Sequence, residues 1–118
     1  MRWQIELHPE FEREFDALAA EVQDELLAAA GALRILGPQL GRPRVDTLKG
    51  SRHANMKELR FDAADGVWRV AFAFDPRRRA VLLVAGDKSG VAQQRFYRQL
   101  IARADDRLDG HLAALRRR

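Results

Sequence analysis

Basic side chains interrupt three strand-like runs in the middle of this chain of 118 residues. Residues 57–88 read KELRFDAADGVWRVAFAFDPRRRAVLLVAGDK, in which apolar residues take alternate positions and AADG and PRRR form turn-like links. The alternation predicts an antiparallel meander of strands over residues 56–62, 67–75 and 80–87. Arg60, Arg69 and Lys88 stand between the apolar positions. Because guanidinium groups bind phosphate oxygens through paired hydrogen bonds, this row has the chemistry to hold a phosphate group.

The lengths of the two links decide which residues lie opposite each other. If both are symmetrical four-residue links, Arg60 lies opposite Arg69, and Arg69 lies opposite Gly86. One face of the sheet then carries Glu58, Arg60, Arg69, Ala71, Ala73, Gly86 and Lys88. The other face carries an apolar surface for a helix to cover, formed by Leu59, Phe61, Trp68, Val70, Phe72, Phe74, Val81, Leu83 and Ala85. A one-residue bulge would change this register.

Two like charges directly opposite each other destabilise a sheet by a few tenths of a kcal/mol up to about 1 kcal/mol, so the arginine pair needs compensation. One interpretation is that Glu58, Asp62 or Asp87 neutralises the arginines on an ordinary exposed face. The other is that the arginines bind an anion, and that the small residues Ala71, Ala73 and Gly86 leave a trough for a phosphate chain. The residues alone leave both interpretations open.

The charge of the chain is unevenly distributed. Residues 1–30 hold eight acids and two bases, a local balance of −6, whereas residues 31–118 hold nineteen bases and nine acids, a balance of +10. The isoelectric point of the sequence is about 10.3. A basic surface attracts polyanions by releasing their counterions, so nucleic acid or an acidic protein is the first partner to consider.

Composition and motifs exclude several classes of protein. A content of 47% hydrophobic and 32% charged residues is typical of one folded domain of this length. The sequence has no cysteine, which excludes disulfides, thiolate zinc sites and cysteine nucleophiles. The three histidines lack metal-ligand spacing, and AGDKSG lacks the spacing of a phosphate-binding Walker loop, so we expect no metal or cofactor. With no apolar run of about 18 residues and no signal-peptide pattern, we expect a cytoplasmic protein without membrane contact.

The elements around the meander must position the basic row. WQIEL predicts a short strand, and apolar residues from Phe11 to Leu33 recur at helical spacing, either as one helix or as a hairpin broken near Ala19. Residues 37–55 predict a long loop whose bases are either a mobile phosphate-contacting arm or ordinary solvated charges: Arg42, Arg44, Lys49 and Arg52. His53 of this loop could act as an acid or base. The last 28 residues predict a helix with a possible interruption at Gly110. Tyr97 of this helix is either a core aromatic residue or a residue that directs its hydroxyl to a base or phosphate.

Three ordered segments resemble a known family. They are GPQLGRPRVDTLKGSRHANMKELRF, then WRVAFAFDPRRRAVLLVAGDK, then FYRQLIARADDRLDGHL, and the resemblance spans about residues 5–115. The chain resembles the HigB-like branch of the RelE/ParE superfamily, the toxins of bacterial type II toxin–antitoxin modules. The resemblance implies a single toxin domain over residues 1–118 with a small RelE-like α+β fold. It implies a curved antiparallel sheet, an N-terminal helix or helical hairpin, a C-terminal helix, and a helix-turn-helix antitoxin as partner.

The resemblance also implies a function. RelE and HigB relatives cut messenger RNA on the ribosome, whereas ParE relatives poison DNA gyrase on the same scaffold, so fold and function are separate questions. We expect a metal-independent mRNA endoribonuclease toxin that associates with the ribosome and inhibits translation. The alternatives are a ParE-like gyrase inhibitor and a non-catalytic basic RNA-binding module.

Site residues follow from the resemblance position by position. RelE-type members keep basic and tyrosine catalytic residues in certain neighbourhoods of the chain. In this sequence, those neighbourhoods hold Lys57, Arg60, Arg69, Lys88 and Tyr97. Strict alternation turns Lys57 toward the core, and no clear equivalent of the histidines of some HigB members stands out unless His53 or His111 approaches the site. The RNA-binding residues expected in the loop are Arg42, Arg44, Lys49, Arg52 and His53.

Overall fold

Five strands and three α-helices form the fold in the computed structural model, which describes residues 2–117. The strands are β1 (Gln4–Leu7), β2 (Val45–Thr47), β3 (Lys57–Ala63), β4 (Gly66–Phe74) and β5 (Arg79–Asp87). The helices are α1 (Pro9–Asp16), α2 (Ala20–Leu36), α3 (Gln93–Arg116) and the short 3-10 helix η1 (Gly37–Gln39). The sheet order is β1-β5-β4-β3-β2. The class is α+β, as the sequence predicts, and β1 makes the sheet mixed because it pairs with β5 in parallel.

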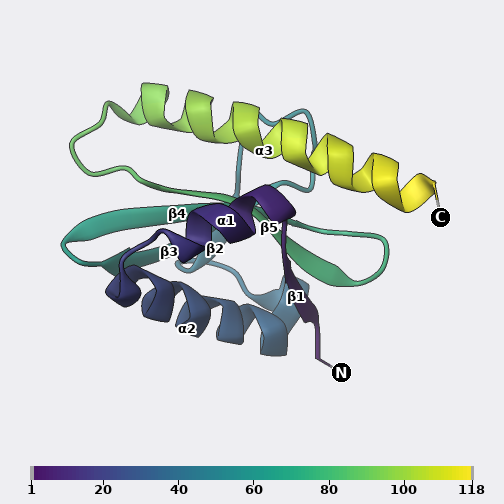
Figure 1. Cartoon of the computed structure of the whole chain (residues 1–118), viewed down its shortest axis with the longest axis horizontal. Helices are drawn as coiled ribbons and strands as arrows, with labels where there is room; N and C mark the ends of the chain where they lie inside the picture. Colours follow the sequence, from purple (N-terminus) through teal and green to yellow (C-terminus); the bar gives the residue numbers. More distant parts are fainter. Residues whose placement is uncertain (1, 118) are drawn as a thin grey trace.

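Both faces of the sheet are covered by helices. Figure 1 shows α3 over one face and α2 over the other, with α1 between them in this view, in front of the sheet. The layer beneath α2 contains Phe11, Leu26, Leu33, Val70 and Phe72 among its buried residues. The layer beneath α3 contains Ala71, Ala73, Val84, Leu100 and Leu108 among its own. Both faces of the sheet are therefore apolar where helices cover them, whereas the sequence predicted only one apolar face.

The β3–β4 hairpin has the predicted register. Ala63 pairs with Gly66, Arg60 with Arg69, and the connection is a tight two-residue turn. Ala64 and Asp65 supply the positive φ angles, 49° and 61°, that such a turn requires. The AADG link therefore fixes the arginine pair.

A bulge changes the register between β4 and β5. Arg69 pairs with Gly86 and Ala71 with Val84, as predicted, but Phe72 then pairs with Leu82, so Leu83 is the extra residue. The face predicted for Val81 and Leu83 is wrong, because both lie in the layer beneath α3. An inserted residue shifts the alternation of every residue beyond it. The basic row lies on the unshifted side of the bulge.

The structure decides between the helical alternatives that the sequence leaves open in the N-terminal and C-terminal segments. The N-terminal apolar run forms a hairpin of two helices, α1 and α2, which are separated at residues 17–19. The final helix passes through Gly110 without interruption. The predicted loop over residues 37–55 is wrong in part, since it contains η1 and the edge strand β2, and Val45 of β2 pairs with Leu59. Within residues 2–117, no helix is long and apolar enough to cross a membrane.

A buried charge cluster fastens the end of α3 to the β4–β5 turn. The side chain of Asp75 is fully buried and accepts hydrogen bonds from the Arg79 Nε at 3.0 Å and from backbone N–H groups of the turn. His111 Nε2 of α3 lies 2.9 Å from the same carboxylate. Arg79 also donates to Glu6 of β1 at 2.9 Å. Although burial alone would raise the pKa of Asp75, the bonds from His111 and Arg79 hold that pKa below its ordinary value.

We expect Asp75→Asn to destabilise the protein by about 2–4 kcal/mol at pH 7, because it removes the buried carboxylate that faces Arg79 and leaves the more exposed Glu6 as the counter-charge. The native pKa of Asp75 is lowered, so the stability from its charge is present above about pH 4 and is lost as pH falls through the native pKa. The free energy of unfolding in urea, measured from pH 7 downward for both proteins, checks this. Parallel curves at every pH would contradict it.

Candidate functional site

Four side chains meet where β3 and β4 pass under the first turn of α3. Arg60 of β3 pairs directly with Arg69 of β4, and Glu58 lies on the same strand and face as Arg60. Glu58 Oε2 lies 3.0 Å from Arg60 Nη2, and Glu58 Oε1 lies 3.6 Å from Arg69 Nε. The hydroxyl of Tyr97 in α3 donates to Glu58 Oε1 at 2.7 Å. We call Glu58, Arg60, Arg69 and Tyr97 the arginine–glutamate cluster.

A glycine lets α3 come close enough to complete the cluster. Gly86 pairs with Arg69, and a Cβ added to Gly86 would lie 2.9 Å from the Phe96 ring. Phe96 is buried next to Tyr97, so the missing side chain allows the first turn of α3 to seat on the sheet. The structure thus brings together three of the predicted catalytic residues: Arg60, Arg69 and Tyr97.

The electrostatics of the cluster depend on burial. The side chains of Glu58, Arg69 and Arg60 are 5%, 12% and 31% exposed. The hydrogen bond that Arg60 donates to Glu58, together with the charge of that carboxylate, raises the pKa of Arg60. Burial, followed by the bond to Glu58, raises the pKa of Tyr97, so the phenol keeps its proton at neutral pH. The cluster therefore combines two fixed positive charges, one carboxylate and one neutral hydroxyl donor.

Of the two sequence interpretations of the arginine pair, neutralisation by Glu58 describes this structure. The predicted open trough is wrong in its position, because Ala71 and Ala73 are fully buried beneath α3 and Gly86 packs on Phe96. Small residues there allow helix packing rather than leaving space. Of the two arginines, Arg60, at the end of the cluster toward β2, is the more exposed.

The arginines keep unused donors. Within residues 2–117, the buried Nε atoms of Arg60 and Arg69 have no hydrogen-bond partner. Asp46 of β2 lies 3.4 Å from Arg60 Nη2 and 3.1 Å from Arg42 Nε. A bond from the backbone of Thr47, followed by Arg42, lowers the pKa of Asp46. An unpaired guanidinium N–H group is costly, so each of these two Nε–H groups retains the capacity to donate to an oxygen acceptor.

The two predicted catalytic lysines, Lys88 and Lys57, occupy different places in the sheet. Lys88 directly follows β5, and its backbone N–H donates to the Val67 carbonyl at 2.9 Å, which keeps it in register beside Arg69 and Gly86. Lys57 begins β3 and lies on the same face of this strand as Leu59, which is buried in the layer beneath α2. The register thus separates Lys57 from the face that carries Arg60.

The predicted RNA-binding loop divides in a similar way. Arg52 pairs with Asp109 and, at 3.8 Å, with Asp105 of α3, and His53 Nε2 lies 2.7 Å from Asp109. Ser51 also bonds to Asp105, so this part of the loop is fastened to α3. The remaining loop bases are exposed: Arg42, Arg44 and Lys49. His111 lies in the Asp75 cluster, outside the arginine–glutamate cluster.

Two acids of the site were not predicted as site residues. The sequence pattern indicates Glu58 only as a neutralising charge and predicts a loop at Asp46. The signal for Glu58 was its position two residues from Arg60, which puts both on one face of a strand. Asp46 gave no comparable signal, because β2 is three residues long and has no detectable alternation.

A solved structure of the Escherichia coli toxin RelE, a double arginine-to-alanine mutant in the free state, matches this fold. The TM-score is 0.58 at 11% identity, over 86% of this chain and 96% of that chain. The chain therefore has the RelE-type fold.

Sequence comparison gives the family. The profile described as "Phage derived protein Gp49-like (DUF891)" matches residues 13–109. The toxin HigB3 of Mycobacterium tuberculosis is 44% identical over 108 residues, which is 92% of either chain. Toxin HigB2 of the same organism is 44% identical over 99 residues, 83% of this chain, although the chain spans about half (49%) of that protein's length. The chain belongs to the Gp49-like family and is a HigB-like toxin with the RelE-type fold.

Proposed function

We propose that this toxin is a metal-independent endoribonuclease that cuts messenger RNA on the ribosome and thereby inhibits translation. The observation that carries the proposal is the arginine–glutamate cluster, which gathers a carboxylate, a neutral phenol and two guanidinium groups within hydrogen-bond and ion-pair distances. The basic balance of residues 31–118 favours a polyanionic substrate. The HigB and RelE relatives support the toxin class.

The groups of the cluster match the needs of RNA cleavage. In this reaction the ribose 2′-oxygen loses a proton and attacks the adjacent phosphorus, and the bond from phosphorus to the 5′-oxygen breaks. Glu58 is the base that accepts the 2′-hydroxyl proton, and Tyr97 donates a proton toward the departing 5′-oxygen. Arg60 and Arg69, with Lys88 beside them, stabilise the negative charge that develops on the phosphoryl oxygens.

The chemistry specifies the products. One fragment ends in a 2′,3′-cyclic phosphate and the other begins with a 5′-hydroxyl. Sequencing of the transcript ends after purified toxin is added to ribosomes that carry a defined message tests the proposal. Intact message, or ends with 5′-phosphates, would contradict it.

The proposed partners follow from the family and the charge. They are a cognate helix-turn-helix antitoxin, the ribosome and messenger RNA, and the proposed place of action is the cytoplasm, where translation occurs. The exposed loop bases Arg42, Arg44 and Lys49 are proposed to contact RNA. Arg52 and His53 would contribute there only if their pairs with Asp109 open.

We expect Tyr97→Phe to slow RNA cleavage by about 10²-fold, because the ring stays in place while the proton donor is removed. The hydroxyl contacts Glu58 rather than the core, so RNA affinity and thermal stability should change little. Single-turnover cleavage and RNA binding, measured on the same preparation, separate the two effects. An unchanged cleavage rate would return Tyr97 to a packing role.

A further inference from the structure

Two carboxylates face each other across the β2–β3 pair. Asp46 of the edge strand β2 lies directly opposite Glu58 of β3. Like charges in such a cross-strand pair repel each other and destabilise a sheet. A single nitrogen compensates both of them, since Arg60 Nη2 lies 3.0 Å from Glu58 Oε2 and 3.4 Å from Asp46 Oδ2. Glu58 and Asp46 therefore share one guanidinium nitrogen.

The surroundings of the two carboxylates differ. The Asp46 side chain is 24% exposed, and its oxygens accept hydrogen bonds from the Thr47 N–H at 2.8 Å and from Arg42 Nε at 3.1 Å. The bond from Thr47, followed by that from Arg42, holds the pKa of Asp46 below its ordinary value, so this carboxylate stays ionised at neutral pH. Glu58 is buried, and its other oxygen accepts a bond from the Tyr97 hydroxyl. Asp46 thus supplies a fixed negative charge, whereas Glu58 is directed into the site.

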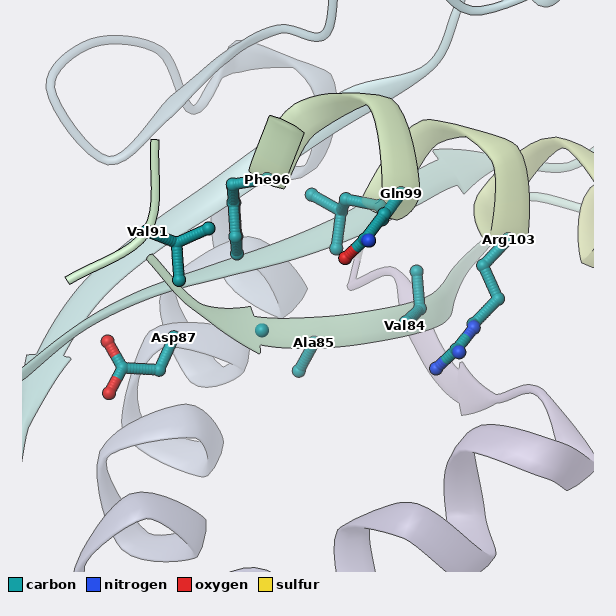
Figure 2. A pocket seen from close by; sticks show the side chains of 9 residues that line it. Val84, Ala85, Asp87, Val91, Phe96, Gln99 and Arg103 are labelled. Atoms are coloured by element: carbon teal, nitrogen blue, oxygen red, sulfur yellow. The ribbon is translucent and has the colours of Figure 1, made fainter. Parts of the chain in front are cut away.

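Other ionisable groups near the first turn of α3 lie outside this network. Figure 2 shows Asp87 and Arg103 at opposite ends of a cavity of about 240 Å³ between β5 and α3. The hydrogen bonds that Asp87 accepts come from backbone N–H groups of β4 and of the segment after β5. Within residues 2–117, the side chains that contact the Glu58 carboxylate are those of Arg60, Arg69 and Tyr97. Asp46 is coupled to Glu58 through the first of these.

We propose that Asp46 is a positioning residue for RNA cleavage, which shares Arg60 with Glu58 and thereby keeps Glu58 basic enough to accept the 2′-hydroxyl proton. A negative charge close to a carboxylate favours the protonated form of that carboxylate. A guanidinium that is divided between two carboxylates also neutralises each of them less fully. Both effects act in the same direction. The inference rests on the proposed endoribonuclease function and extends it to a residue outside the arginine–glutamate cluster.

We expect Asp46→Asn to move the acid limb of the pH–rate profile for cleavage to lower pH by about half a unit or more. The amide keeps the size of the side chain and an oxygen for the Thr47 N–H, but it has no charge. Arg60 then neutralises Glu58 alone, so Glu58 becomes a weaker base and the rate at the plateau falls several-fold. Single-turnover cleavage at saturating RNA, over the pH range in which the protein stays folded, measures the midpoint and the plateau.

Arg42→Gln should move the same midpoint to higher pH. Arg42 and Arg60 contact the same oxygen of Asp46, Oδ2. Without Arg42 this oxygen interacts with Arg60 alone, which draws Arg60 away from Glu58, and a nearby positive charge is also lost. Saturating RNA removes any contribution of Arg42 to affinity. A loss of folding cannot produce opposite shifts from two residues that contact each other.

Three further variants serve as controls. Asp62→Asn removes one negative charge from an exposed position of β3 and should keep the wild-type midpoint. Asp46→Glu keeps the charge and should keep the midpoint closer to that of the wild type than Asp46→Asn does. In the Glu58→Gln background, Asp46→Asn should no longer move the acid limb, because the group that responds has been removed.

Other outcomes would overturn the inference. Equal profiles for Asp46→Asn and Asp62→Asn would make Asp46 an ordinary edge-strand charge and would leave the proposed function in place. A shift that persists in the Glu58→Gln background would assign the acid limb to another base. Absence of cleavage by the wild type at every pH would contradict the proposed function itself, and the inference with it.

Discussion

Replacing Arg69 with alanine is expected to reduce RNA cleavage by about 10²- to 10³-fold and to abolish growth arrest. Arg69 lies at the centre of the arginine–glutamate cluster, between Arg60 on β3 and Gly86 on β5. Its loss removes charge that a phosphoryl group needs in the transition state. Growth of cells that express the variant, together with single-turnover cleavage by the purified protein, measures the effect.

The fold should survive this substitution. The Arg69 guanidinium donates to the adjacent Trp68 carbonyl at 2.9 Å, and its removal also relieves the repulsion from Arg60. Arg77→Ala, at an exposed position of the β4–β5 turn, is the matched control and should remain toxic. A fully toxic Arg69→Ala variant, or one that is merely unfolded by circular dichroism, would show that the cluster is misassigned.

Glu58→Gln is expected to slow cleavage by about 10²- to 10⁴-fold, because the amide cannot accept the 2′-hydroxyl proton. The same change should tighten RNA binding, since the carboxylate no longer competes with phosphate for Arg60 and Arg69. Slower chemistry with tighter binding is a combination that a folding defect does not produce. Fluorescence anisotropy for affinity and rapid mixing for the cleavage step measure the two quantities.

Glu12→Gln, at an exposed position of α1, provides the control for loss of one negative charge. It should change neither quantity beyond a small effect of net charge. If Glu58→Gln cleaves at the wild-type rate across the pH range, Glu58 is only a counter-ion of the arginines. The proton acceptor would then have to be sought elsewhere in the site.

The sequence predicted the structural features that depend on local residue patterns. Alternation and the short AADG link were sufficient for the β3–β4 register, because a tight turn fixes every pair that follows it. Helical spacing predicted α1, α2 and α3 in the same way. The positions of Arg60, Arg69 and Tyr97 therefore followed from the chain itself and from the family resemblance.

The remaining errors concern features that arise from tertiary packing. The bulge after Ala71 reversed the expected faces of Val81 and Leu83, and no residue type marks it in the sequence. The open trough was wrong because small residues accommodate a helix as readily as a ligand, and Gly86 is where Phe96 packs. The loop after α2 was partly wrong because β2 is stabilised by pairing with β3 rather than by its own propensity.

The measurement that tests the central claim most directly is a cell-free translation reaction supplied with purified toxin. The account expects the message to be cut in ribosomal complexes, with 2′,3′-cyclic phosphate ends, and expects Arg69→Ala to leave it intact. A parallel reaction with DNA gyrase and plasmid should yield no double-strand breaks. Intact message accompanied by gyrase-dependent breaks would contradict the account, and so would RNA binding without either product.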